Sequence, residues 1–157
     1  MKENFISQNT NNDDLHISNP MKITGTSTKQ NEHREGVLWS SPPLGWLKAN
    51  FDGYAKENLG KARFGGVLRD HYRIVVDSMS IPIGHSTSYK AEAIAALYTV
   101  KMAVETGYRN LWLEGNSLNI INMLNNKNMV TWNIDGSIME IKNLINFFDK
   151  VMISYNF

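Results

Sequence analysis

The chain has 157 residues, of which 42% are hydrophobic and 20% are charged, and its formal net charge is +1. This length supports one hydrophobic core. A charge this close to zero excludes the global electrostatic footprint of a strongly basic nucleic-acid or membrane binder. The chain has no cysteine, which excludes disulfides and thiolate zinc sites, and its four histidines show no paired metal-ligand spacing.

Residues 1–36 are rich in Asn, Thr, Ser, Lys and Gln, with only isolated apolar residues. Such a segment buries too little surface to offset its ordering entropy, so we predict a disordered polar tail. The chain has no hydrophobic signal core and no apolar run of membrane-spanning length. We therefore expect an intracellular protein of the cytoplasm or nucleus, without a membrane partner.

The stretch 39–53 reads WSSPPLGWLKANFDG. Its two prolines favour an extended or turn backbone, and Gly45 lets the chain bend before a strand that begins at Trp46. We predict that Asp52 ends this strand and that Gly53 leaves the backbone open to a ligand. Taken alone, an Asp-Gly pair is more typical of a hairpin turn.

Two further strands are predicted at 63–70 and 74–83, joined by short turns into an antiparallel meander. Paired glycines inside the first of them, Gly65 and Gly66, indicate a bulge or a close backbone approach.

A helix is predicted over 88–106, with its cap among Ser86, Thr87 and Ser88. Apolar residues line two of its sides, which is typical of a helix between two layers. A strand at 108–114 follows, and a connection through a long helix predicts that it runs parallel to a neighbour in the same sheet.

The remaining elements are two helices and a strand. A short helix is predicted over 117–125, and a capping box from Ser137 to Glu140 predicts the start of the next helix. Residues 151–157 are predicted to form the last strand.

Four motifs occur in order along the chain: W-x-x-P-P-x-G-W-x-K-x-N-x-D-G at 39–53, GGVLRD at 65–70, YKAEA with a following AL at 89–97, and EGNS at 114–117. Together they resemble the plant ribonuclease H-like domains of the ribonuclease H type 1, reverse-transcriptase-like family, which are related to modules of non-LTR retroelements. The resemblance covers 39–157.

The resemblance implies an α/β, ribonuclease H-like domain over residues 37–157. It implies a mixed five-stranded sheet with helices on both faces, in which the fourth strand lies parallel beside the first. It also implies an RNA–DNA hybrid endonuclease that uses two Mg²⁺ ions, or Mn²⁺ in their place, held by carboxylates from separate elements. Hard oxygen ligands suit these ions, which stabilise the attacking water and the leaving oxygen.

The resemblance assigns the catalytic and metal-binding positions to Asp52, Glu92 and Asn116. Glu92 stands among apolar neighbours, which favours a buried site over a charged surface. A carboxylate early in a helix also interacts favourably with the helix dipole, by roughly 0.3–1 kcal/mol, and this is the structural alternative for Glu92.

Two departures from the family pattern predict weak or absent hydrolysis. Asn116 stands where the family has Asp, which removes one negative charge from the metal site; we also expect it to cap the helix that follows. The family pattern continues after the last strand into R-x-x-N-x-x-A-D, which supplies a fourth acid. Residues 1–157 do not include it, so we expect a C-terminally truncated domain whose C-terminal helix is missing and whose metal is weakly bound or absent.

Three functions stay open at this point: a hybrid endonuclease with residual activity, a catalytically dead nucleic-acid-binding module, and a truncated gene product. The partner is predicted to be an RNA–DNA hybrid or RNA, bound by a monomer. The residues predicted to contact it are Lys48, Gly53, Arg63, Arg69 and Ser117. For each cation the alternative is a solvated strand edge that discourages aggregation.

Overall fold

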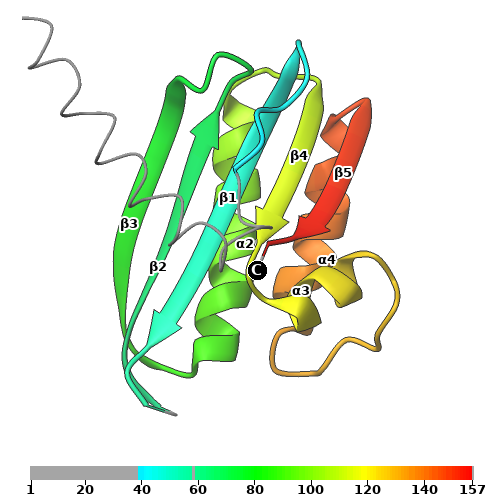
Figure 1. Ribbon diagram of the computed structural model, residues 1–157. Helices are drawn as coiled ribbons and strands as arrows, with labels where there is room; N and C mark the ends of the chain where they lie inside the picture. The colour runs from blue at the N-terminus through cyan, green and yellow to red at the C-terminus, as the bar shows by residue number, and fades with distance from the viewer. Residues whose placement is uncertain (1–38, 58, 157) are drawn as a thin grey trace, which may run out of the picture. The chain divides into compact units, whose positions relative to one another are not determined.

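The computed structural model describes residues 39–57 and 59–156. The tail predicted over residues 1–36 lies outside this part of the chain. Five strands form one sheet in the order β3-β2-β1-β4-β5 (Figure 1). Their bounds are β1 Trp46–Ala55, β2 Gly60–Arg69, β3 Val75–Ser86, β4 Asn110–Gly115 and β5 Lys150–Tyr155.

The pairing of the strands confirms the predicted topology. β1 pairs with β2 and β2 pairs with β3, both antiparallel. β4 is parallel to β1 on its other side, and β5 is parallel to β4. β1 therefore lies at the centre of the sheet, and the crossover to β4 brings the ends of these two strands together.

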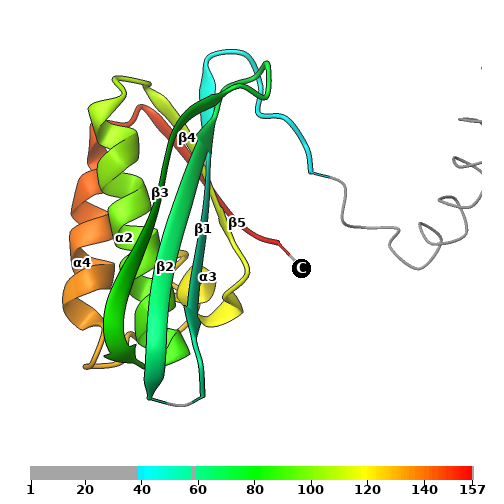
Figure 2. The same ribbon diagram turned by 90° about the vertical axis from the view of Figure 1, so that its left-hand side faces the viewer.

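The helices are α2 Ser88–Glu105, α3 Leu118–Leu124 and α4 Asp135–Leu144, followed by the 3₁₀ helix η1 Ile145–Phe147. Among the described residues, α2 and α4 lie on one face of the sheet (Figure 2), and the buried residues of α3 belong to the same core cluster, so these helices differ from the predicted arrangement on both faces. None of these helices combines the length and apolarity that a bilayer crossing requires.

Alternation along β1 explains the one-sided packing. Leu47, Ala49 and Phe51 are buried in the core beneath the helices. The residues between them point to the opposite face because side chains of a strand alternate. We call that opposite side the open face, and Lys48, Asn50 and Asp52 lie on it.

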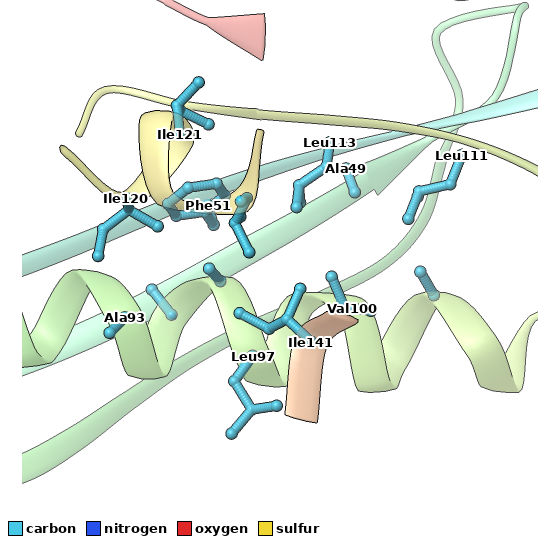
Figure 3. Packing of buried hydrophobic residues seen from close by; sticks show 14 of the residues in the cluster. Ala49, Phe51, Ala93, Leu97, Val100, Leu111, Leu113, Ile120, Ile121 and Ile141 are labelled. Carbon is cyan, nitrogen blue, oxygen red and sulfur yellow. The ribbon is translucent and has the colours of Figure 1, made fainter. Parts of the chain in front are cut away.

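The predicted position of α2 between two layers is confirmed. α2 packs on β1 and β2 on one side and on α4 on the other, with Ala93 and Val100 near Phe51 and Ile141 in the core (Figure 3). Its cap is Thr87, whose hydroxyl accepts a hydrogen bond from the backbone N–H of Lys90 at 3.2 Å.

The capping box predicted at Ser137 is wrong. α4 begins two residues earlier, at Asp135, and no side chain caps it. Ser137 therefore lies inside the helix, where Ile138 and Ile141 are buried against the core. Tertiary burial of these apolar residues decides where the helix begins, in place of the local motif.

Candidate metal and nucleic-acid site

A depression of about 440 Å³ lies on the open face where β1, β2 and β4 meet. Its polar lining includes Asn50, Asp52, Glu114, Asn116 and Asn156, and glycines from β2 and β4 line it as well. The depression contains two of the three residues predicted to be catalytic, and the third lies beside it.

Asp52 lies within β1 and not at its end, because the strand continues for three more residues to Ala55. It is exposed on the open face, directly across from Gly65 of β2. A Cβ atom at Gly65 would meet only backbone atoms of β3 within 4 Å, so the space in front of Asp52 stays accessible. The carboxylate is therefore presented to solvent from a paired strand.

Gly53 serves helix packing and not ligand access, which corrects the prediction. It is buried, and a Cβ atom here would collide with the backbone of Ala91 and Glu92 in α2. Only glycine lets the helix approach β1 this closely. This close approach of the helix places Glu92 next to Asp52, the residue before Gly53.

Glu92 has a pKa raised above its ordinary value. Burial is the main cause, because it penalises the charged carboxylate, and the negative charge of Asp52 raises the pKa further. A hydrogen bond with Ser117 acts in the opposite direction. Glu92 also lies beyond the first turn of α2, which contains no acidic residue, so the helix-dipole alternative is weak.

The raised pKa predicts that Glu92→Gln stabilises the domain at neutral pH. A carboxylate whose pKa is higher in the folded than in the unfolded state lowers stability as pH rises through that pKa. At pH 7 we expect the thermal midpoint of the variant to exceed that of the wild type by about 1–3 °C, and near pH 3 the gap should close. Differential scanning calorimetry at both pH values measures this. The exposed Glu57→Gln variant should show no such pH-dependent gap.

Asn116 follows β4 and is exposed at the depression. The prediction that it caps the next helix is wrong, because Ser117 occupies the N-cap of α3 and makes no side-chain capping bond. Ser117 is 7% exposed and its side chain interacts with Glu92 instead. The site therefore draws its groups from β1, α2 and the end of β4.

A buried polar network lies beside these residues. Lys48 Nζ is 3.1 Å from Glu114 Oε1, which also accepts a hydrogen bond from Asn50 Nδ2 at 3.0 Å. Ser154 donates to the other carboxylate oxygen of Glu114 at 3.3 Å and accepts from Trp112 Nε1 at 2.7 Å. The network joins β1, β4 and β5 under the rim of the depression.

Comparison with known proteins places this geometry in a family. The family model described as "Reverse transcriptase-like" matches residues 50–157, which include Asp52, Glu92 and Asn116. The chain belongs to this family. The chain is 36% identical over 88 residues to a protein of Arabidopsis thaliana. The name of that protein assigns it provisionally as a ribonuclease H protein. That match covers 56% of this chain and only 14% of the Arabidopsis protein, so the chain spans a small part of that relative.

Solved structures show that the reverse-transcriptase-like domain has a ribonuclease H fold. RNase H1 of Halobacterium salinarum NRC-1 matches with a TM-score of 0.66 and 24% identity, over 70% of this chain and 84% of that chain. The N-terminal RNase H domain of a Mycobacterium tuberculosis protein matches with a TM-score of 0.68 and 18% identity, over 70% and 81%. LC11-RNase H1 in complex with an RNA/DNA hybrid matches with a TM-score of 0.64 and 19% identity, over 69% and 83%.

In this reverse-transcriptase-like domain, three of the five residues predicted to contact nucleic acid are buried. Lys48 is 1% exposed, paired with Glu114 and bonded to the carbonyl oxygen of Ser40 at 3.0 Å. Gly53 and Ser117 face α2, as described above. Arg63 and Arg69 remain on the open face, because they alternate with the buried residues of β2. A cation as buried as Lys48 does not present its charge to a phosphate.

The donor types of the three predicted site residues are those that a divalent cation prefers. Asp52 and Glu92 offer carboxylate oxygens and Asn116 offers an amide oxygen, all of them hard ligands that suit Mg²⁺ or Mn²⁺. Among the described residues, no group of three or more acidic or imidazole side chains is placed to hold a metal. Glu114 borders the depression, but its charge is balanced by Lys48.

The sequence interpretation missed the roles of Asn50, Glu114 and Ser154. A signal was present in β1, where Lys48 stands between the apolar residues Leu47 and Ala49. A lysine among strongly apolar neighbours in a central strand indicates a buried partner of opposite charge. Its partner is 66 positions away, and only the parallel pairing of β1 with β4 brings it near.

Proposed function

We propose that this domain binds an RNA–DNA hybrid, or RNA, across its open face and hydrolyses the RNA strand slowly. The observation that carries the proposal is the close approach of the Glu92 backbone to β1 at Gly53, which sets Glu92 beside Asp52 at the edge of an open depression. Repulsion between two carboxylates favours either a shared proton or a bound cation. The known relatives support the choice of nucleic acid, since one similar structure contains an RNA/DNA hybrid.

Each site residue has a separate role in the proposed reaction. Asp52 and Glu92 would hold a divalent cation, and the amide oxygen of Asn116 would be a third ligand. Such a cation, when bound, supplies the Lewis acidity that activates water and stabilises the leaving oxygen. Gly65 leaves room for the scissile phosphate in front of Asp52. Ser117 holds the Glu92 carboxylate in place and offsets part of the desolvation of its charge.

Asn116 is the reason that we propose slow hydrolysis. An amide keeps one oxygen ligand but carries no charge, so positions 52, 92 and 116 together hold two negative charges where the family pattern places three at the same positions. A unit charge about 4 Å from a cation contributes on the order of 4 kcal/mol per cation charge at the effective dielectric of a protein surface. Desolvation of the added charge offsets part of this, but the loss still weakens metal affinity. This observation also favours the second candidate function, a nucleic-acid-binding module without catalysis.

Cleavage and binding assays on the same RNA–DNA hybrid test the proposal. We expect salt-dependent binding, and slow cleavage of the end-labelled RNA strand in Mg²⁺ or Mn²⁺ that Asp52→Asn abolishes. Binding without any cleavage would support the catalytically dead module. The absence of both binding and cleavage would overturn the proposal.

Asn116→Asp should restore charge to the metal site. We expect Mn²⁺ to bind the variant about tenfold or more tightly than the wild type, because a carboxylate replaces a neutral amide. Isothermal titration calorimetry measures the affinity. Asn128→Asp, which adds the same charge in the loop after α3, serves as the matched control. Equal gains in both variants would show that general electrostatics, and not a ligand position, sets the affinity.

A further inference from the structure

Beyond Asp52, the open face continues along β1 and β2 to a second polar feature. Tyr54 is 62% exposed and lies directly across from Arg63 in the antiparallel register. Both side chains alternate with buried residues, so they stand on the same face as Asp52. Together with Asp52 and Gly65 they line a depression of about 200 Å³ next to the larger one.

Neither side chain is engaged within the described residues. The guanidinium of Arg63 forms none of the three ion pairs, which join Lys48, Lys101 and Arg109 to carboxylates. The ring of Tyr54 takes part in none of the aromatic or cation–π contacts. Within the described residues, an exposed aromatic ring therefore lies beside a guanidinium that forms no ion pair. Such a pair of side chains is better suited to binding a ligand than to internal packing.

The chemistry of the two side chains matches one nucleotide. Arginine recognises phosphate through charge-assisted, often bidentate hydrogen bonds. An exposed tyrosine ring stacks on a base, and it needs a base that is not already stacked inside a duplex. Two residues along a strand span about 7 Å, so a strand whose phosphate lies in front of Asp52 can place a neighbouring base over Tyr54.

We propose that Tyr54 and Arg63 form a subsite for an unpaired nucleotide beside the carboxylates. Arg63 binds the phosphate of this nucleotide and Tyr54 stacks on its base. The preferred ligand is therefore a hybrid with a single-stranded extension, and not a blunt hybrid. This inference rests on the proposed nucleic-acid binding of the same face. It adds a preference for hybrids with a single-stranded extension, which the carboxylates alone do not give.

Two labelled RNA–DNA hybrids test the subsite: one is blunt, and the other carries a three-nucleotide single-stranded extension at each end. Fluorescence anisotropy measures their binding, in a buffer with EDTA that prevents cleavage. We expect the extension to tighten wild-type binding by about fivefold to a hundredfold, the range of stacking on one base. Tyr54→Ala should lose this gain and keep blunt-hybrid binding, whereas Tyr54→Phe should keep both. Tyr72→Ala removes a tyrosine of similar exposure from the β2–β3 turn and should change neither.

Arg63→Gln should weaken binding of the extended hybrid and lower the salt dependence by about one counterion. Arg109→Gln, in the residue before β4 and so at the opposite end of that strand from the site, is its matched control, because Arg109 is exposed and pairs with Asp149 instead of lining either depression. A cross-strand pair such as Tyr54 and Arg63 also stabilises a sheet slightly. Thermal midpoints of all variants therefore accompany the binding data, to separate folding from recognition.

The outcomes separate the subsite from the function on which it rests. Wild-type binding without any gain from the extension would overturn the subsite and leave the proposed function standing. A full gain in Tyr54→Ala would do the same. Failure of the wild type to bind either hybrid would overturn both.

Discussion

Gly53→Ala is expected to destabilise the domain by about 3 kcal/mol or more, at or above the upper end of the usual cost of overpacking, because the atoms that the new Cβ meets cannot move aside. The added Cβ would overlap the backbone of Ala91 and Glu92, and neither obstacle is the flexible end of a side chain. Relief requires the first turns of α2 to move away from β1. That movement would also separate Glu92 from Asp52, so metal binding should weaken together with stability. Urea denaturation gives the free energy of unfolding, and Mn²⁺ titration gives the second readout.

Gly136→Ala is the matched control for this substitution. Gly136 lies in α4, and a Cβ atom there would meet nothing within 4 Å. Alanine in a helix without a steric conflict should stabilise the domain by about 0.5–1 kcal/mol. Opposite signs for the two variants would support the close approach of α2 to β1. Small effects of the same sign would contradict it, and the placement of Glu92 would need another cause.

The topology of the sheet follows from connection lengths that are visible in the sequence. Short turns after β1 and β2 allow only antiparallel pairing, whereas an 18-residue helix before β4 makes a parallel return possible. The motif order then predicts which strand lies beside β1. This is why the convergence of Asp52 and Asn116 at one depression could be predicted before any coordinates were known.

The roles of individual polar residues could not be predicted in the same way, because their partners lie far away in the sequence. Gly53 looked open to a ligand, but its neighbour in space is a helix that begins 35 positions later. Lys48 looked like a phosphate contact, but residues before β1 and in β4 enclose it. Local patterns record the type of side chain and the element that carries it. They do not record which long-range contact removes a charge from solvent.

Lys48→Met should cost about 3–5 kcal/mol of stability, because it leaves Glu114 buried without its cation. Glu114 is 8% exposed, and Asn50 and Ser154 then remain as its hydrogen-bond donors. Glu114→Gln should cost less, since Lys48 keeps the carbonyl oxygen of Ser40 and the ring of Trp112, 3.9 Å from Nζ to the ring centroid. Chemical denaturation of both variants measures the difference between the two losses.

The double variant Lys48→Met/Glu114→Gln distinguishes a true ion pair from two independent contacts. It leaves no buried charge, so we expect it to be more stable than Lys48→Met alone and to show a clear coupling energy in a double-mutant cycle. Lys101→Met is the control, because it breaks a 2.7 Å pair with Glu140 that is far more exposed than the Lys48–Glu114 pair and should cost about 1 kcal/mol at most. Additive losses at Lys48 and Glu114 would mean that water reaches both groups. The rim of the depression would then be solvated.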